Sequence, residues 1–181
     1  DKCTGLGELK ANQTGAKTHG LSLHSTLAVT SNGLPLGVLK AQCIAPQSRA
    51  DDGKRASSKV PIEEKKTFVW LEHHRDLVEL SRTLPHTRLI HVCDREADFF
   101  ELFDEQRQQA TVDILIRAKH DRKLNAAPFK LFAAVRQAPE QGRIQVPIPK
   151  QSARKKKSKQ KARVARPKRL ATLTLRHQSI E

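Results

Sequence analysis

The 181-residue sequence contains no methionine, no tyrosine and only three cysteines. Cys3, Cys43 and Cys93 are widely spaced and form no Cys-x-x-Cys pair, so they predict reduced thiols of a cytosolic protein rather than disulfides or zinc ligands. No apolar run approaches the length needed to cross a membrane, and no signal peptide follows Asp1. The missing methionine and the charged start predict an internal piece of a longer polypeptide.

Carboxylates are absent from residues 141–180, a segment that holds 13 of the 34 Lys and Arg residues. The rest of the chain has 21 basic residues against 19 acids, so the net charge of +15 is concentrated near the C-terminus. A cationic segment on a near-neutral body predicts a polyanionic partner, most often nucleic acid. A solvated basic linker or a ribosome-like tail is the alternative interpretation.

Hydrophobic periodicity predicts an α/β protein. Residues 20–44 alternate on both sides of an Asn-Gly turn, the pattern of a β-hairpin, and the flanking residues 1–19 and 45–61 are predicted to be irregular. A helical pattern follows Pro61, with Trp70 expected in the core and the pair His73-His74 expected in solvent. The predicted elements after residue 61 are a helix over 62–84 (or two, broken near His73-His74), a strand over 88–94, a helix over 96–108, a strand over 112–118, a helix over 128–137, and strands over 142–148 and 171–176 joined by a cationic loop over 151–169.

The apolar strand over 88–94 ends on Asp94, at the place where α/β folds tend to keep catalytic groups. A carboxylate there suits a hard divalent cation, but an Asp in the same position also caps a following helix by accepting backbone N–H groups. Spacing alone leaves these two roles open. Glu96 and Asp98 are expected in the first helical turn, where acids are favoured, and Arg95 is expected to pair with them or to reach phosphate.

A second polar group, formed by Arg117, Lys119 and His120, follows the strand over 112–118. If a right-handed crossover joins the two strands in one sheet, their carboxyl ends emerge at the same edge. Cations beside a carboxylate would then bind phosphate next to a metal ion, as phosphoryl transfer requires. A solvated strand exit is the alternative.

The stretch Val92-Cys93-Asp94-Arg95-Glu96-Ala97-Asp98, followed by Ile116-Arg117-Ala118-Lys119-His120, resembles the DDE (Asp-Asp-Glu) transposases of bacterial insertion sequences. The branch is the insertion-sequence-four family, which includes the transposon-five transposase. The resemblance covers almost the whole chain. Further matching stretches are Leu6-Gly7-Glu8-Leu9, His24-Ser25, Gly33-Leu34-Pro35-Leu36-Gly37, Glu63-Glu64-Lys65-Lys66, Trp70-Leu71 and Thr172-Leu173-Thr174-Leu175.

This resemblance implies a ribonuclease H-like mixed sheet with helices in residues 1–120 and an inserted, truncated, β-rich basic subdomain in residues 121–181. It implies Mg²⁺-dependent (or Mn²⁺-dependent) phosphodiester hydrolysis and strand transfer at transposon ends, with Asp94 as the second triad acid and a metal ligand, supported by Arg95, Glu96 and Asp98. The implied partners are double-stranded DNA, at transposon ends and target, and a second copy of the full-length parent, in the bacterial cytoplasm at the nucleoid. The residues expected to contact DNA are Arg117, Lys119, His120, Arg122, Lys123, Arg154, Lys155, Lys156, Lys157, Lys159 and Lys161.

Two parts of the family pattern are absent from the sequence. No Asp-Thr pair provides the first triad acid, and without tyrosine there is no Tyr-x-x-Arg-x-x-x-Glu motif for the third. An N-terminal strand and a C-terminal helix are therefore expected to be missing, and the metal is not expected to be retained. The alternatives to a transposase fragment are a non-catalytic basic nucleic-acid-binding module and the remnant of a decayed transposase.

The purified 181-residue chain is expected to cleave no DNA, because it holds one of three triad acids. Incubation of supercoiled plasmid with the chain and Mg²⁺ measures this directly. Mg²⁺-dependent nicking that is abolished by Asp94→Ala would contradict the expectation.

Overall fold

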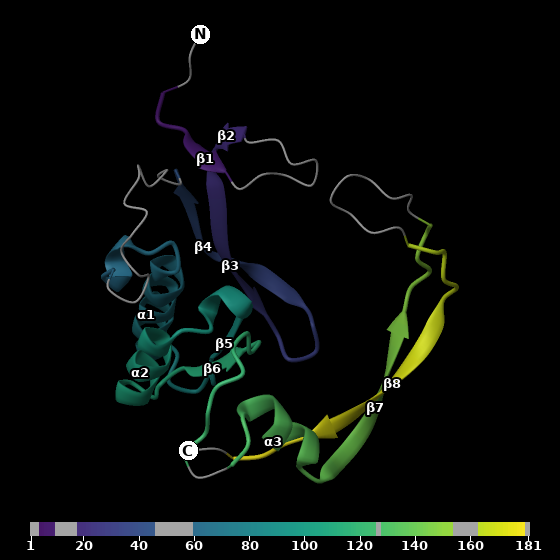
Figure 1. Ribbon diagram of the computed structural model, residues 1–181. Helices are drawn as coiled ribbons and strands as arrows, with labels where there is room; N and C mark the ends of the chain where they lie inside the picture. The colour runs from purple at the N-terminus through teal and green to yellow at the C-terminus, as the bar shows by residue number, and fades with distance from the viewer. Residues whose placement is uncertain (1–3, 10–17, 46–59, 126–127, 154–162, 180–181) are drawn as a thin grey trace. The chain divides into compact units, whose positions relative to one another are not determined.

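The computed structural model describes residues 4–9, 18–45, 60–125, 128–153 and 163–179, which form a mixed α/β structure (Figure 1). The chain divides into two compact units, Asp1–Lys119 and His120–Glu181, here called unit 1 and unit 2. This division falls one residue before the predicted boundary. The irregular segment predicted over 45–61 lies almost wholly outside the described residues.

The predicted hairpin is confirmed. Strand β3 (Ser22–Val29) pairs antiparallel with β4 (Pro35–Ile44), and the turn closes through the Gly33 N–H, which donates to the Thr30 carbonyl at 2.9 Å. Gly33 has a φ of +89°, which explains why the turn uses an Asn-Gly pair.

The prediction that residues 1–19 are irregular was wrong in part. Strands β1 (Gly7–Leu9) and β2 (Thr18–Gly20) form a short antiparallel pair. Three residues are too few to show an alternating pattern in the sequence. A Cβ at Gly20 would lie 2.9 Å from Leu9 Cδ1, so a larger residue there would require the Leu9 side chain to shift.

The predicted helix over 62–84 begins later than expected. A 3₁₀ turn η2 (Ile62–Glu64) is followed by extended backbone at Lys65, with φ −88° and ψ 145°, and the α-helix α1 then spans Phe68–Thr83 without a break at the histidine pair. The acids after Pro61 therefore belong to the 3₁₀ turn rather than to the α-helix.

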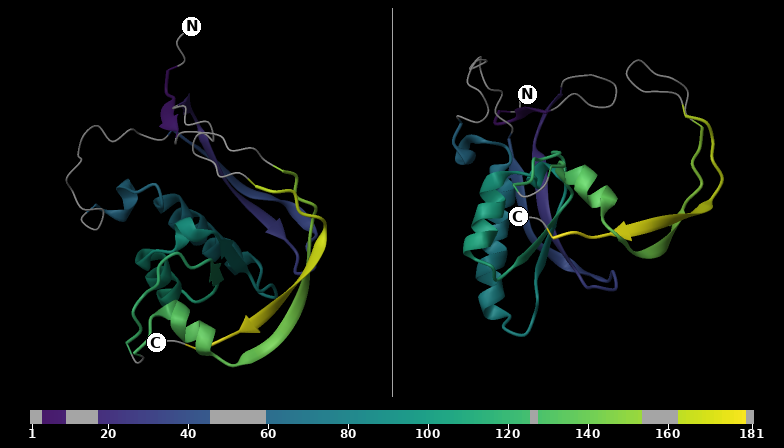
Figure 2. Two further views of the ribbon diagram at one scale, coloured as in Figure 1. Left: turned by 45° about the vertical axis from the view of Figure 1, so that its right-hand side comes forward. Right: turned by 60° about the horizontal axis from the view of Figure 1, so that its bottom comes forward.

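The two predicted strands are confirmed, although β5 (Ile90–Cys93) and β6 (Asp113–Ile116) are each shorter than the apolar run. They pair in parallel, the arrangement that the sequence left as a condition. The predicted helix over 96–108 is split into a 3₁₀ turn η3 (Arg95–Ala97) and the α-helix α2 (Phe100–Gln108). The break lies at Phe99, whose backbone is extended, with φ −139° and ψ 154°. The views in Figures 1 and 2 show α1 and α2 side by side on one side of the β3–β4 hairpin.

The core of unit 1 lies between the helices and the β5–β6 pair. One buried cluster contains Leu71, Cys93, Ala97 and Leu102, and Trp70 packs against it, as expected, while remaining partly exposed. A second cluster contains Leu77, Val78 and Val112. Among the described residues, neither cluster includes a residue of β3 or β4.

The prediction that His73 and His74 are solvated was wrong, because their exposed fractions are 1% and 0%. They share one face of α1 with Trp70, Leu77 and Val78, at the spacing of successive helical turns. Helical periodicity therefore places them inside, and it outweighs the charged residues beside them in the sequence.

Unit 2 consists of the helix α3 (Leu131–Gln137) and the strands β7 (Glu140–Ile148) and β8 (Arg169–Arg176). The two strands pair antiparallel as a long ribbon, as predicted (Figure 1). The helix begins three residues after Pro128, and the Phe132 N–H in its first turn donates to Asp121 Oδ1 at 2.9 Å. In the part of the chain that the structure describes, no helix combines the length and apolarity needed to cross a membrane.

Candidate active-site corner and nucleic-acid interface

Asp94 directly follows β5, and its side chain is exposed. Its Oδ1 accepts the Glu96 N–H at 2.7 Å, so the carboxylate caps the 3₁₀ turn η3. The capping role left open by the sequence is therefore real. A carboxylate has several acceptor sites, and one backbone hydrogen bond leaves others for a cation.

The end of β6 lies next to the end of β5, at the edge of the parallel pair that we call the candidate active-site corner. In the register Cys93 faces Ile116, and the Arg117 N–H donates to the Cys93 carbonyl at 3.3 Å. The residues that follow the two strands, Asp94 and Arg117, thus leave the same edge of one parallel pair. Arg117 and Lys119 are both exposed there.

Asp98 connects the segment after β5 to the segment after β6 by a hydrogen bond. Its exposed fraction is 5%, and its Oδ2 accepts the Lys119 N–H at 2.6 Å, across 21 residues of sequence. The expectation that Asp98 lies in the first turn of an α-helix was wrong, because the chain is extended between η3 and α2. Arg95 and Glu96 are exposed in η3, beside Asp94 in sequence.

The buried neighbour of Asp94 is a thiol of low reactivity. Burial, reinforced by the negative charge of Asp94, raises the pKa of Cys93 to about 12. Cys43 is exposed, and both cysteines are free thiols, as predicted for these two positions. The prediction for Cys3 lies outside the described residues.

Within the described ranges, no group of three or more His, Cys, Asp or Glu side chains has the geometry to hold a metal ion. Asp94 can therefore supply one oxygen ligand of the kind that Mg²⁺ and Mn²⁺ accept, but it does not form a complete site with its described neighbours.

Positive charge is divided unequally between the units. Unit 2 contains 17 of the 34 Lys and Arg residues but only 3 of the 19 acids, whereas unit 1 contains 17 basic residues and 16 acids. Unit 1 is close to neutral, so almost all of the net charge of +15 belongs to unit 2. A concentration of cations in one unit is typical of modules that bind polyanions.

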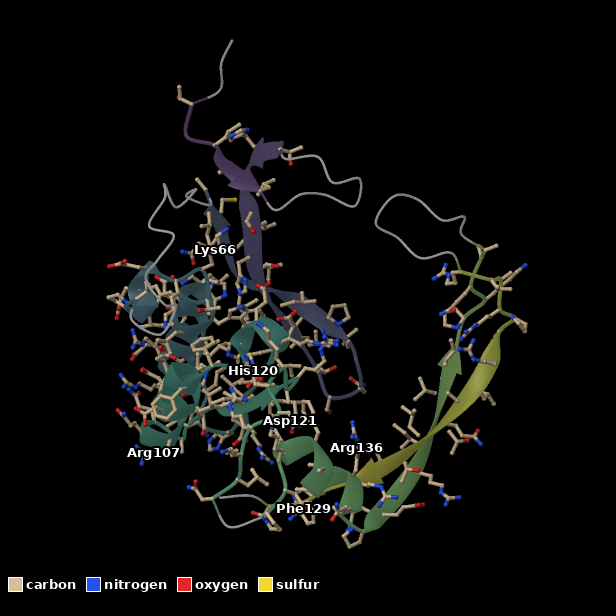
Figure 3. The ribbon with its side chains drawn as sticks, viewed as in Figure 1. Lys66, Arg107, His120, Asp121, Phe129 and Arg136 are labelled. Atoms are coloured by element: carbon tan, nitrogen blue, oxygen red, sulfur yellow. The ribbon has the colours of Figure 1, made fainter. Side chains whose placement is uncertain are left out.

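The cations of unit 1 are also paired locally. Figure 3 shows basic and acidic side chains interleaved over α1 and α2, including Arg107. The ion pairs in unit 1 include Lys40–Asp76, Lys65–Glu101, Arg75–Glu105, Arg82–Glu79, Arg88–Asp113 and Arg107–Asp104. In the described part of unit 2 the ion pairs include Arg143–Glu140.

Three of the residues predicted to contact DNA, His120, Arg122 and Lys123, lie at the start of unit 2. There the Arg122 carbonyl accepts the Leu131 N–H at 2.8 Å, and Lys123 forms an isolated β-bridge with Lys130. They belong to a different unit from Asp94, Arg117 and Lys119. Arg154, Lys155, Lys156, Lys157, Lys159 and Lys161 lie outside the described residues.

Further cations of unit 2 flank the basic loop. Gln151 and Arg166 exchange backbone hydrogen bonds of 2.9 Å in both directions, and the Arg163 guanidinium donates to the Ser152 carbonyl. Arg136 projects from α3 (Figure 3). The sequence indicated a basic segment but did not single out these residues.

Comparison with models of known protein families and with curated proteins finds no match to this chain.

The hydrogen bond of Asp98 predicts a graded effect of substitution. Asp98→Ala removes the acceptor of the Lys119 N–H inside the protein and should lower the free energy of unfolding by roughly 1–3 kcal/mol. Asp98→Asn keeps an acceptor oxygen and should lose less. Urea unfolding gives the stability, and hydrogen exchange at the Lys119 amide reports the contact.

Lys119 exchange should accelerate strongly in Asp98→Ala and weakly in Asp98→Asn. Equal protection of this amide in the wild type and in Asp98→Ala would show that Asp98 does not hold the exit of β6.

Proposed function

We propose that this chain acts in DNA transposition, as part of the catalytic region of a DDE transposase. The observation that supports this most directly is the arrangement of charged residues at one edge of the parallel pair. Asp94 follows β5, Arg117 follows β6, and the buried Asp98 holds Lys119 at the same corner. A simple polyanion-binding domain does not need a carboxylate at the centre of such an edge.

The proposal extends to the fold. An antiparallel hairpin, a parallel pair and helices on one side are parts of a ribonuclease H-like mixed sheet, and we assign unit 1 to such a domain. We assign unit 2, with its antiparallel ribbon and excess of cations, to a basic insertion that follows the DNA backbone.

In this role each residue has a defined task. A bound Mg²⁺ would supply Lewis-acid activation at the scissile phosphate, and Asp94 would provide one of its oxygen ligands. Arg117 and Lys119 would neutralise phosphate oxygens of the DNA strand at the same edge. Asp98 would fix the backbone that carries Lys119, and Arg95 and Glu96 would flank the ligand.

A non-catalytic basic nucleic-acid-binding module is the second candidate. It is favoured by the concentration of cations in unit 2 and by the capping hydrogen bond that Asp94 accepts from the Glu96 N–H. In that case Asp94 serves only as the cap of η3. A decayed transposase that no longer binds DNA is the third candidate.

DNA binding is tested by its salt dependence. The affinity of the whole chain for a DNA duplex should fall steeply as salt rises, because each neutralised phosphate contributes about −0.9 to the slope of log K against log salt. Deletion of residues 155–161 removes five lysines and should flatten the slope by up to about 4.5. Fluorescence anisotropy between low and moderate salt measures both quantities.

Arg82→Ala is the matched control for this experiment, since Arg82 is an exposed cation on α1 that pairs with Glu79. It should leave the slope unchanged. A wild-type chain with no affinity at low salt would support the decayed reading, and an unchanged slope after the deletion would exclude the loop from DNA binding.

Metal binding separates the two leading candidates. With a DNA duplex present, Mn²⁺ should broaden the amide resonances of residues 94–98 and 117–119 in nuclear magnetic resonance spectra, because a paramagnetic ion on Asp94 lies beside both segments. Asp94→Asn should abolish the broadening. Asp113→Asn is the control, since Asp113 starts β6 at the opposite end and pairs with Arg88.

Selective broadening that depends on Asp94 supports the transposase assignment. Broadening that is equal in the wild type and in Asp94→Asn would assign the chain to the non-catalytic binding class.

A further inference from the structure

The β3–β4 hairpin is attached to α1 by polar groups. The Thr26 hydroxyl is hydrogen-bonded to His73 Nδ1 at 2.6 Å, Lys40 forms an ion pair with Asp76, and the His24 ring meets the His73 ring edge-on at 4.6 Å between centroids. We call these five residues the polar seam. The hairpin contributes no described residue to the two buried apolar clusters, so the seam is its main described attachment to the helix.

Several large apolar side chains of the hairpin point the other way, although Ala28 and Ile44 are partly buried. Leu23, Leu27 and Val38 lie on the opposite face from His24 and Thr26, and each is more than half exposed. This is the reverse of the usual arrangement, in which the apolar face of a sheet packs on the core. Undocking the hairpin from α1 therefore costs little apolar burial.

The seam continues into a row of histidine rings. His24 also meets the Trp70 ring edge-on at 4.5 Å, and His74 stacks on His91 at 5.6 Å. His73 Nε2, His91 Nδ1 and both ring nitrogens of His74 are buried without a hydrogen-bond partner in the described structure. A neutral imidazole tolerates such a place far better than an imidazolium, whose charge would lack compensation.

The surroundings favour the neutral form of each ring. Burial, together with the nearby His24 and Lys40, lowers the pKa of His73 to about 4, against an opposing effect of Asp76. Burial and the other three histidines lower the pKa of His91 to about 4 as well.

The two remaining rings follow the same direction. Burial lowers the pKa of His24, reinforced by Lys40 and opposed by Glu96 and Asp94. Burial also lowers the pKa of His74, opposed by Glu105 of α2.

We propose that the polar seam is a proton-operated latch, in which protonation of His73 releases the β3–β4 hairpin from α1 while the apolar clusters of unit 1 stay packed. Protonation would place a second positive charge beside Lys40 and against the His24 ring. Asp76 is the acid of the seam, and its side chain is 54% exposed, so its compensation is weakened by solvent. The released hairpin would lose its strand pairing, because an isolated two-stranded hairpin is marginally stable in water.

The direction of the pH dependence follows from the lowered pKa. The docked hairpin binds fewer protons than the released one, so docking is strongest above pH 6.5 and weakens as the pH falls from 6.5 towards 4. If the released His73 regains its ordinary pKa, the equilibrium for release rises roughly 30-fold between pH 7.5 and pH 5 from this one residue.

Hydrogen exchange on the whole chain tests the latch. Amides of β3 and β4 should lose about 30-fold in protection between pH 7.5 and pH 5, after correction for intrinsic exchange rates. Amides of Leu77 and Val78 in α1 should change much less. His73→Gln retains an acceptor for Thr26 without a titrating group and should blunt the loss, whereas the exposed His86→Gln, just after α1, should leave it unchanged.

Titration of the histidine rings by nuclear magnetic resonance needs no variant and decides the matter if His73→Gln fails to fold. In the docked hairpin the His73 ring should titrate near pH 4, or its signals should change together with the hairpin amides. An ordinary His73 titration with a protected hairpin would overturn the latch. So would hairpin protection that is equal at pH 7.5 and pH 5, simultaneous loss of protection in α1, or a wild-type pH response in His73→Gln.

Discussion

The parallel ladder between β5 and β6 is the constraint on which the rest of unit 1 depends. Because parallel strands begin at one edge and end at the other, the ladder brings Asp94 and Arg117 to a single corner across more than 20 residues of sequence. Beyond the end of the sheet, the buried carboxylate of Asp98 accepts the Lys119 N–H and so fixes the backbone at Lys119. Without the ladder the acid and the cations would be unrelated groups on separate loops.

Sequence patterns predicted the elements with strong periodicity and missed those whose cause is tertiary. The Asn-Gly hairpin and the β7–β8 ribbon follow from alternation, with turn chemistry adding to the first, and both are present. The strands of the parallel pair follow from two apolar runs. The extended backbone at Phe99 follows the buried Asp98, whose hydrogen-bond partner lies 21 positions away, and no local pattern contains such a partner.

The candidate site shows the same limit. Asp94 could be selected because a strand-end acid is visible as the end of an apolar run, and its capping bond to Glu96 follows from its residue type. The prediction for His73 and His74 is wrong because the charged residues beside them suggest a solvated face, whereas their helical spacing from Trp70 and Leu77 places them in the core. The row of buried histidines cannot be predicted from composition, because its rings come from different elements that meet only in the folded chain.

The division of charge between the units has a consequence for motion along a polyanion. In the proposed DNA-binding role, a unit with 17 basic residues and 3 acids would be held to phosphates by forces that depend little on base sequence, so it would slide and hop along a duplex. The near-neutral unit 1 would add far fewer phosphate contacts, chiefly through Arg117 and Lys119. Salt would therefore tune long-range search by unit 2 far more than local inspection by unit 1.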